Sequence, residues 1–264
     1  MPLAPPRSLS PSKVSSFTNC PLAFRLSVID RLPERPSVAA VKGTLVHRAL
    51  EALVWEHAPG DRTVAVAMDE LERAWRAMQE DDEELLQLDL DGDAAAAFVA
   101  DAAQLVHGYF ELEDPDGVDA VGVELGLEAD LDGMRLRGII DRLDRTPTGD
   151  LVVVDYKTGR APSARFEQAR LAGVHVYALL CERVLGRAPV EVRLLYLREP
   201  VAIAAKPSDQ ALRGQRQRTL AVWRAIERAC GAGDFRPRPS RLCDYCSYQA
   251  MCPAFGGEPP AVPA

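Results

Sequence analysis

The segment from Gly138 to Gly159, GIIDRLDRTPTGDLVVVDYKTG, constrains the fold of this chain more than any other stretch. Apolar runs stand on both sides of the turn-forming residues 146–149, which predicts two strands joined by a turn. Strands joined in this way pair antiparallel. Counting back by equal steps from the turn places Asp141 opposite Asp155, or within one residue of it.

The charges on these two strands predict a cation site. Side chains alternate along a strand, so Asp155 and Lys157 are expected on one face and Tyr156 on the other. Two directly opposed carboxylates would lie about 5 Å apart and repel each other, and oxygen ligands favour magnesium or manganese over zinc. Acids facing water at a sheet edge are the alternative. The apolar runs 139–140 and 152–154 instead indicate a strand buried on both faces, where an unpaired charge costs several kcal/mol.

Three cysteines near the C-terminus have the spacing of metal ligands. Cys243, Cys246 and Cys252 form C-x2-C-x5-C in a Pro-flanked segment that lacks a fourth ligand. A tetrahedral site needs four ligands, and Cys20, followed by proline as Cys252 is, is the candidate for the fourth. Spacing does not separate zinc from iron and sulfur. The remaining cysteines, in apolar helical surroundings, are expected in the core.

The order of these motifs resembles a known nuclease family. Glu124, then GIIDR with Asp141, then DYKTG with Asp155 and Lys157 resembles the PD-(D/E)XK nuclease superfamily, and within it the RecB-like exonucleases, including the CRISPR-associated ones. The resemblance implies an α/β fold: a central mixed sheet flanked by helices, with a helical insertion and termini stapled by an iron-sulfur cluster.

The same resemblance implies roles for the site residues. His47, at the G-T-x-x-H position, would supply a metal ligand beside Asp141, Asp155 and the backbone carbonyl of Tyr156. These groups would hold one or two Mg²⁺ or Mn²⁺ ions, with Glu124 assisting. Lys157 would orient or deprotonate the attacking water, or stabilise the developing oxyanion.

The split cysteines resemble the iron-sulfur staple of the CRISPR-associated RecB-like nucleases and of the AddB component of a helicase-nuclease. That likeness implies a [4Fe-4S] cluster on Cys20, Cys243, Cys246 and Cys252, with zinc as the competing interpretation.

We expect one nuclease domain over residues 1–264. Residues 58–118 would form the helical insertion, 1–30 and 231–256 together the cluster region, and 257–264 a disordered tail. No apolar run is long enough for a signal peptide or a membrane span, so a cytoplasmic location without membrane contact is expected.

Net charge is −8, but its distribution favours a nucleic-acid partner. Residues 1–48 carry seven Lys or Arg against two acids, and residues 206–241 carry nine against three. The acidity is concentrated between them, notably in the run Glu80–Glu84, which is expected in a loop. Both ends could therefore meet a phosphate backbone, although solvated helix faces would show the same charges.

The sequence therefore predicts a divalent-metal-dependent DNA exonuclease. It would act on single-stranded ends in repair, recombination or CRISPR-type processing, with a helicase or a CRISPR or repair complex as partner, since the chain has no P-loop. A non-catalytic DNA-binding adaptor and a structural zinc protein are the alternatives. One departure from the family stands at Gly173, where many relatives have a glutamine four residues before a tyrosine, here Tyr177.

Overall fold

The computed structural model describes residues 3–261, except for the side chains of residues 164–172 and 174. The chain divides into two compact units. The first consists of Met1–Arg35, Glu128–Gly138 and Asp209–Ala264, and the second of Pro36–Leu127 and Ile139–Ser208. Among the described residues, no helix has the length and apolar character needed to cross a membrane.

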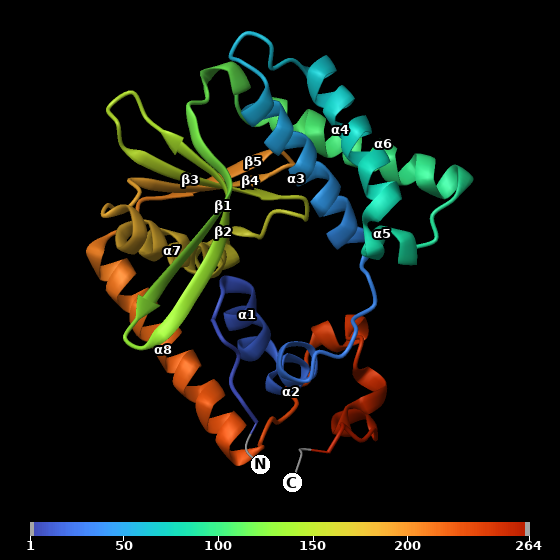
Figure 1. Ribbon diagram of the computed structural model, residues 1–264, viewed down its shortest axis with the longest axis vertical. Helices are drawn as coiled ribbons and strands as arrows, with labels where there is room; N and C mark the ends of the chain where they lie inside the picture. The colour runs from blue at the N-terminus through green and yellow to red at the C-terminus, as the bar shows by residue number, and fades with distance from the viewer. Residues whose placement is uncertain (1–2, 262–264) are drawn as a thin grey trace. The chain divides into compact units, whose positions relative to one another are not determined.

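A five-stranded mixed sheet runs through the fold in the order β1-β2-β3-β4-β5 (Figure 1). Its strands are β1 (Ala120–Leu131), β2 (Met134–Arg145), β3 (Leu151–Lys157), β4 (Glu191–Tyr196) and β5 (Val201–Ala205). The turn between β1 and β2 is Asp132-Gly133 with φ of 54° and 83°, the left-handed pair that a tight two-residue hairpin requires. β3 and β4 are parallel, and α7 (Ala164–Leu185) makes the crossover between them. The expected mixed sheet is therefore confirmed.

The antiparallel pairing of β2 with β3 has the predicted register. Arg145 pairs with Leu151 and Arg142 with Val154, so one further step brings Asp141 level with Asp155. The first six residues of β3 are buried, as expected for a strand covered on both faces. The two acids therefore lie at the point where an apolar strand ends.

Four helices precede the sheet in the second unit: α3 (Val38–Glu56), α4 (Val64–Asp81), α5 (Glu83–Gln87) and α6 (Gly92–Leu112). Apolar residues of α3, α4 and α6 share one core with Val152, Val154 and Tyr156 of β3. Figure 1 shows α3 and α6 on one side of the sheet and α7 on the other. The segment expected as an insertion thus supplies much of the core on the α3 side.

The prediction that the acidic run Glu80–Glu84 forms a loop is wrong. Helix α4 continues through Asp81, and Asp82 then caps α5 by accepting a hydrogen bond from Leu85 N at 3.0 Å. Glu83 and Glu84 occupy the first turn of α5. Acids are stabilising at a helix N-terminus, so a run that suggested a solvated loop starts a helix instead.

The first unit contains α1 (Pro11–Asn19), α2 (Pro21–Phe24) with a following π-helical turn, and α8 (Asp209–Ala232). Three short 3₁₀ helices follow α8: Arg241–Tyr245, Gln249–Met251 and Pro253–Phe255. Ser10 caps α1 by accepting from Lys13 N at 3.3 Å. In the segment expected as a tail, the Pro260 carbonyl accepts from Arg25 Nη2 at 2.6 Å. Residues 262–264 lie outside the described part.

Candidate metal centre

Asp141 is held where β2 and β3 separate. Their ladder ends at Arg142 and Val154, and Tyr156 N then donates to Asp141 Oδ2 at 2.7 Å. A side-chain carboxylate thus accepts from a backbone N–H that has no strand carbonyl opposite it. The Asp141 side chain is 12% exposed, so the carboxylate lies at the edge of the core with one oxygen already fixed.

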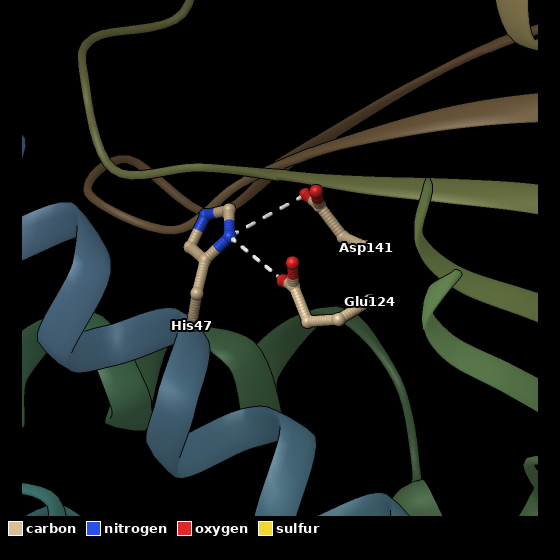
Figure 2. Close-up of side chains that lie close together, drawn as sticks. All are labelled: His47, Glu124 and Asp141. Carbon is tan, nitrogen blue, oxygen red and sulfur yellow. Dashed lines mark ion pairs between the residues drawn. The ribbon is translucent and has the colours of Figure 1, made fainter. Parts of the chain in front are cut away.

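His47 approaches this carboxylate from α3. Its Nδ1 lies 3.6 Å from Asp141 Oδ2 and 3.9 Å from Glu124 Oε1 (Figure 2). Each of the three residues offers one ligand atom, and these atoms lie within 4.8 Å of one another. One nitrogen and two carboxylate oxygens at this spacing could bind the same ion.

Glu124 reaches the centre because β1 is distorted at this residue. Its φ is 42°, a left-handed value that is uncommon for a residue other than glycine. The alternation of buried and exposed residues along β1 also changes phase here, because the buried residues are Gly122, Leu127 and Leu131. An odd step from 122 to 127, then an even step to 131, is the pattern of a bulge, which re-aims a side chain.

Asp155 and Lys157 form an ion pair beside these ligands. The Asp155 side chain is almost fully buried, whereas that of Lys157 is 41% exposed. Burial opposes the charge on Lys157, but Asp155 and Asp141 outweigh it and raise the lysine pKa. Lys157 is therefore a fixed cation at the mouth of the site.

The carboxyl groups bind protons more tightly than usual. Burial and the neighbouring Asp141 raise the pKa of Glu124 to about 7. Burial raises the pKa of Asp141 to about 6, and burial together with Asp141 raises that of Asp155 to about 6. Burial lowers the pKa of His47, which favours the neutral imidazole that binds metals. Three acids that repel one another beside a neutral histidine fit a hard divalent cation.

Arg142 anchors the strand behind the centre. Its side chain is 1% exposed and forms ion pairs with Glu113 and Asp144. Its Nη1 also donates to the hydroxyls of Tyr109 at 3.2 Å and Tyr156 at 2.7 Å. The Tyr156 ring in turn packs edge-on against His47, with centroids 5.7 Å apart. A buried cation with full hydrogen bonding thus fixes the residue between Asp155 and Lys157.

The structure adds two residues that the sequence left unassigned or uncertain. Tyr177 on α7 lies close enough to Asp155, Asp141 and Glu124 that, after burial, their charges raise its pKa. Tyr177 therefore lies near the acids although Gly173 breaks the family pattern before it. Glu51 lies one turn beyond His47 on α3, and burial raises its pKa. The four-residue spacing was the only sequence signal for Glu51.

The four predicted cysteine ligands line one cavity of about 230 Å³ in the first unit. Burial raises the pKa of the Cys246 thiol, and the other three thiols add to the effect. Arg238 N donates to Cys20 Sγ at 3.4 Å. Among the described residues, only His47, Glu124 and Asp141 form a group that could hold one metal ion. Cys181 and Cys230 are buried, as expected.

One histidine, three acids and one lysine thus gather where two strands of a mixed sheet separate. This arrangement is a candidate metal centre for hydrolysis. Residues 8–253 match the PD-(D/E)XK nuclease superfamily, and the chain belongs to that superfamily.

Three known proteins are similar to this chain. The Gene 69 protein of Mycobacterium phage D29 is 27% identical over 273 residues, covering 93% of this chain and 96% of the phage protein. An ATP-dependent helicase/deoxyribonuclease component from Streptococcus mutans is 28% identical over 167 residues, which are 60% of this chain and 15% of that larger protein. A solved structure named "Putative exonuclease", from Eubacterium rectale, has a TM-score of 0.54 at 12% identity and covers 91% of this chain and 87% of its own. That structure bears on the fold alone.

Proposed function

We propose that this protein is a divalent-metal-dependent exonuclease that hydrolyses phosphodiester bonds at single-stranded DNA ends. The observation that carries the proposal is the convergence of His47, Glu124 and Asp141 within 4.8 Å beside the Asp155–Lys157 pair. Three acids with raised pKa values repel one another unless a cation lies among them. Because the chain belongs to a nuclease superfamily, the expected substrate of this centre is a phosphate ester.

Each residue has a task in this proposal. His47, Asp141, Asp155 and the Tyr156 carbonyl would hold Mg²⁺ or Mn²⁺, with Glu124 as a further ligand. The ion would lower the pKa of a bound water and offset charge on the phosphate. Tyr156 N fixes one Asp141 oxygen, which leaves the other free to bind.

The proposed task of Lys157 is electrostatic. A lysine whose pKa is raised by a buried carboxylate stays protonated, which makes it a poor general base. Its ammonium group would orient the attacking water and stabilise the charge that develops on the phosphate oxygens. Asp155 would hold the ammonium group in place through their ion pair.

The proposed substrate is DNA and the proposed partner is a helicase. The similarity to a helicase/deoxyribonuclease component supports DNA as the substrate and a helicase as a partner. A CRISPR or repair complex is the alternative partner. Cleavage that appears only after a helicase is added would make that partner part of the active form.

We also propose that Cys20, Cys243, Cys246 and Cys252 hold a [4Fe-4S] cluster. The shared cavity and the mutual influence of the thiols support a common ligand. Zinc on the same four thiolates is the competing ligand, because both groups bind four cysteines.

The central test is cleavage of end-labelled single-stranded and duplex DNA by anaerobically purified protein with Mn²⁺, Mg²⁺ or EDTA. Metal-dependent shortening is expected, and the label that is lost gives the polarity. Lys157→Ala should reduce the rate by about 10²–10³-fold, and Asp155→Ala should abolish cleavage with the fold intact. Cleavage that survives in Asp155→Ala or in EDTA would overturn the proposed centre.

A further inference from the structure

A cluster of three cations lies at the start of α1 in the first unit. Leu9 and Leu136 form a parallel bridge in which Leu9 N donates to the Arg135 carbonyl and Arg137 N to the Leu9 carbonyl, both at 2.8 Å. Leu9 and Leu136 point into the core. Because side chains alternate, Arg137 points to the outer side, next to the residues that lead into α1.

The side chain of Lys13 extends back toward the residues that precede α1. Its Nζ donates to the carbonyl of Ser8 at 3.0 Å, just before the bridge. Burial and the charges of Arg137 and Arg31 lower the pKa of Lys13. Arg31, exposed and with a φ of 55°, thus completes the group from the turn after the π-helical segment.

Among the residues that the structure describes, no acid is paired with this cation cluster. Within the described ranges, Lys13, Arg31 and Arg137 form no ion pair with a carboxylate, and the first turn of α1 contains no acid. Nearby acids are paired with other arginines: Asp30 with Arg25, Glu128 with Arg135 and Asp132 with Arg216. Three cations near a helix N-terminus repel one another and the positive end of the helix dipole. An anion would remove both costs.

We infer that Lys13, Arg31 and Arg137 bind the phosphate backbone of a nucleic acid strand. The polymer as occupant rests on the proposed nuclease function, whereas the anion site rests on the cluster itself. A free phosphate has the same chemistry as a backbone phosphate. A chain of phosphates is the better match to three cations because each contact also releases a condensed counterion.

The test measures binding of a labelled single-stranded oligonucleotide to Asp155→Asn protein, which should not cleave it, over a range of salt concentrations. The variant is Lys13→Gln/Arg31→Gln/Arg137→Gln. Arg73→Gln/Arg76→Gln/Arg145→Gln, at exposed arginines outside the basic stretches 1–48 and 206–241, makes the same charge change. The slope of log K against log salt should fall in magnitude by about 2 in the cluster variant, and by about 0.7 for Arg137→Gln alone. An unchanged slope, or an equal fall in the control, would overturn the inference.

Two further readouts separate the alternatives. The unfolding temperature of the cluster variant at low salt should equal or exceed that of the Asp155→Asn parent, because repulsion is relieved; a fall would indicate a structural role and overturn the inference. Inorganic phosphate at constant ionic strength should not displace the oligonucleotide, and displacement would replace the polymer with a small anion. If the protein cleaves DNA but the cluster variant keeps the salt dependence of binding, only this inference is wrong. If the cluster variant loses salt dependence but the protein with Asp155 intact never cleaves DNA, only the proposed function is wrong.

Discussion

The backbone N–H of Tyr156 donates to Asp141 Oδ2 at 2.7 Å, one residue beyond the last pair of the β2–β3 ladder. This bond favours the ionised carboxylate, and so does Lys157, yet burial prevails and the pKa of Asp141 rises to about 6. The pKa values of Asp155 and Glu124 are raised as well. The centre is thus destabilising in its ionised, metal-free form, which is expected where charges are grouped for function rather than for stability.

The first prediction concerns pH and metal removal. A carboxyl group with a raised pKa binds its proton more tightly in the folded chain than in the unfolded chain. In EDTA, the free energy of unfolding should therefore fall as pH rises from about 4 to about 7, by on the order of 3 kcal/mol each from Asp141 and Asp155. Mn²⁺ at pH 8 should restore it. Denaturant titrations at several pH values measure the effect.

A substitution isolates the same effect. Asp155→Asn should stabilise the protein in EDTA at pH 8, flatten its pH dependence and abolish the gain from Mn²⁺. Glu111→Gln, exposed on α6, removes one negative charge away from the centre and should change little. If Asp155→Asn were less stable than the unchanged chain under these conditions, the electrostatic account of the centre would be wrong.

The second prediction compares two arginines of β2. Arg142→Met leaves Glu113 and Asp144 without their buried cation and should cost about 3–5 kcal/mol of stability. Arg145→Met breaks the exposed pair with Asp119 and should cost at most about 1 kcal/mol. Thermal unfolding of the two variants measures the difference.

A rescue experiment checks the reason for the Arg142 effect. Adding Glu113→Gln and Asp144→Asn to Arg142→Met should recover part of the loss, because no charge is then left unpaired. Equal costs at Arg142 and Arg145 would mean that the buried network contributes nothing beyond a surface ion pair.

The third prediction compares two glycines inside helices. A Cβ at Gly108 of α6 would lie 2.0 Å from the carbonyl oxygen of Leu197, so the backbone must shift. Gly108→Ala should be destabilising by about 1–3 kcal/mol, despite the better helix propensity of alanine. Among the described residues, a Cβ at Gly173 of α7 meets nothing within 4 Å, so Gly173→Ala should stabilise by about 0.5–1 kcal/mol. If both variants shifted the denaturation midpoint in the same direction, the packing of α6 against the chain after β4 would be contradicted.

Some of the centre was predictable from local rules. The turn at 146–149 sets the β2–β3 register, and that register alone brings Asp141 level with Asp155. His47 was identified only through the family resemblance, because a histidine on a helix gives no sign of which strand it will face. The geometry places it 3.6 Å from Asp141.

Other features depend on tertiary packing that no local pattern encodes. Tyr177 lies near the acids because α7 crosses the sheet, whatever residue stands at Gly173. The bulge at Glu124 has no glycine at its own position to signal it, and only the φ of 42° and the burial pattern of β1 reveal it. The sequence predicts a loop at the acidic run Glu80–Glu84, whereas in the structure Asp82 caps a helix and Glu83 and Glu84 occupy its first turn.

The fourth prediction concerns the cysteine cavity of the first unit. If a [4Fe-4S] cluster is bound, anaerobically purified protein should be brown and contain about four iron atoms per chain. Cys20→Ser and Cys246→Ser should each lose colour and iron, because each removes one of four thiolates. They should also unfold at lower temperature, since a ligand that binds only the folded chain contributes to its stability.

Cys181→Ser is the matched control. Cys181 is fully buried on α7 and outside the cavity, so this variant should keep its iron even if the new hydroxyl lowers stability. Iron retained in Cys20→Ser would remove the link between the two ends of the chain. A colourless protein with one zinc ion that depends on the same four cysteines would replace the cluster with a structural zinc site. Cys20 Sγ accepts a hydrogen bond from Arg238 N at 3.4 Å, and a serine hydroxyl can accept it instead, so Cys20→Ser can keep the local fold while testing ligation.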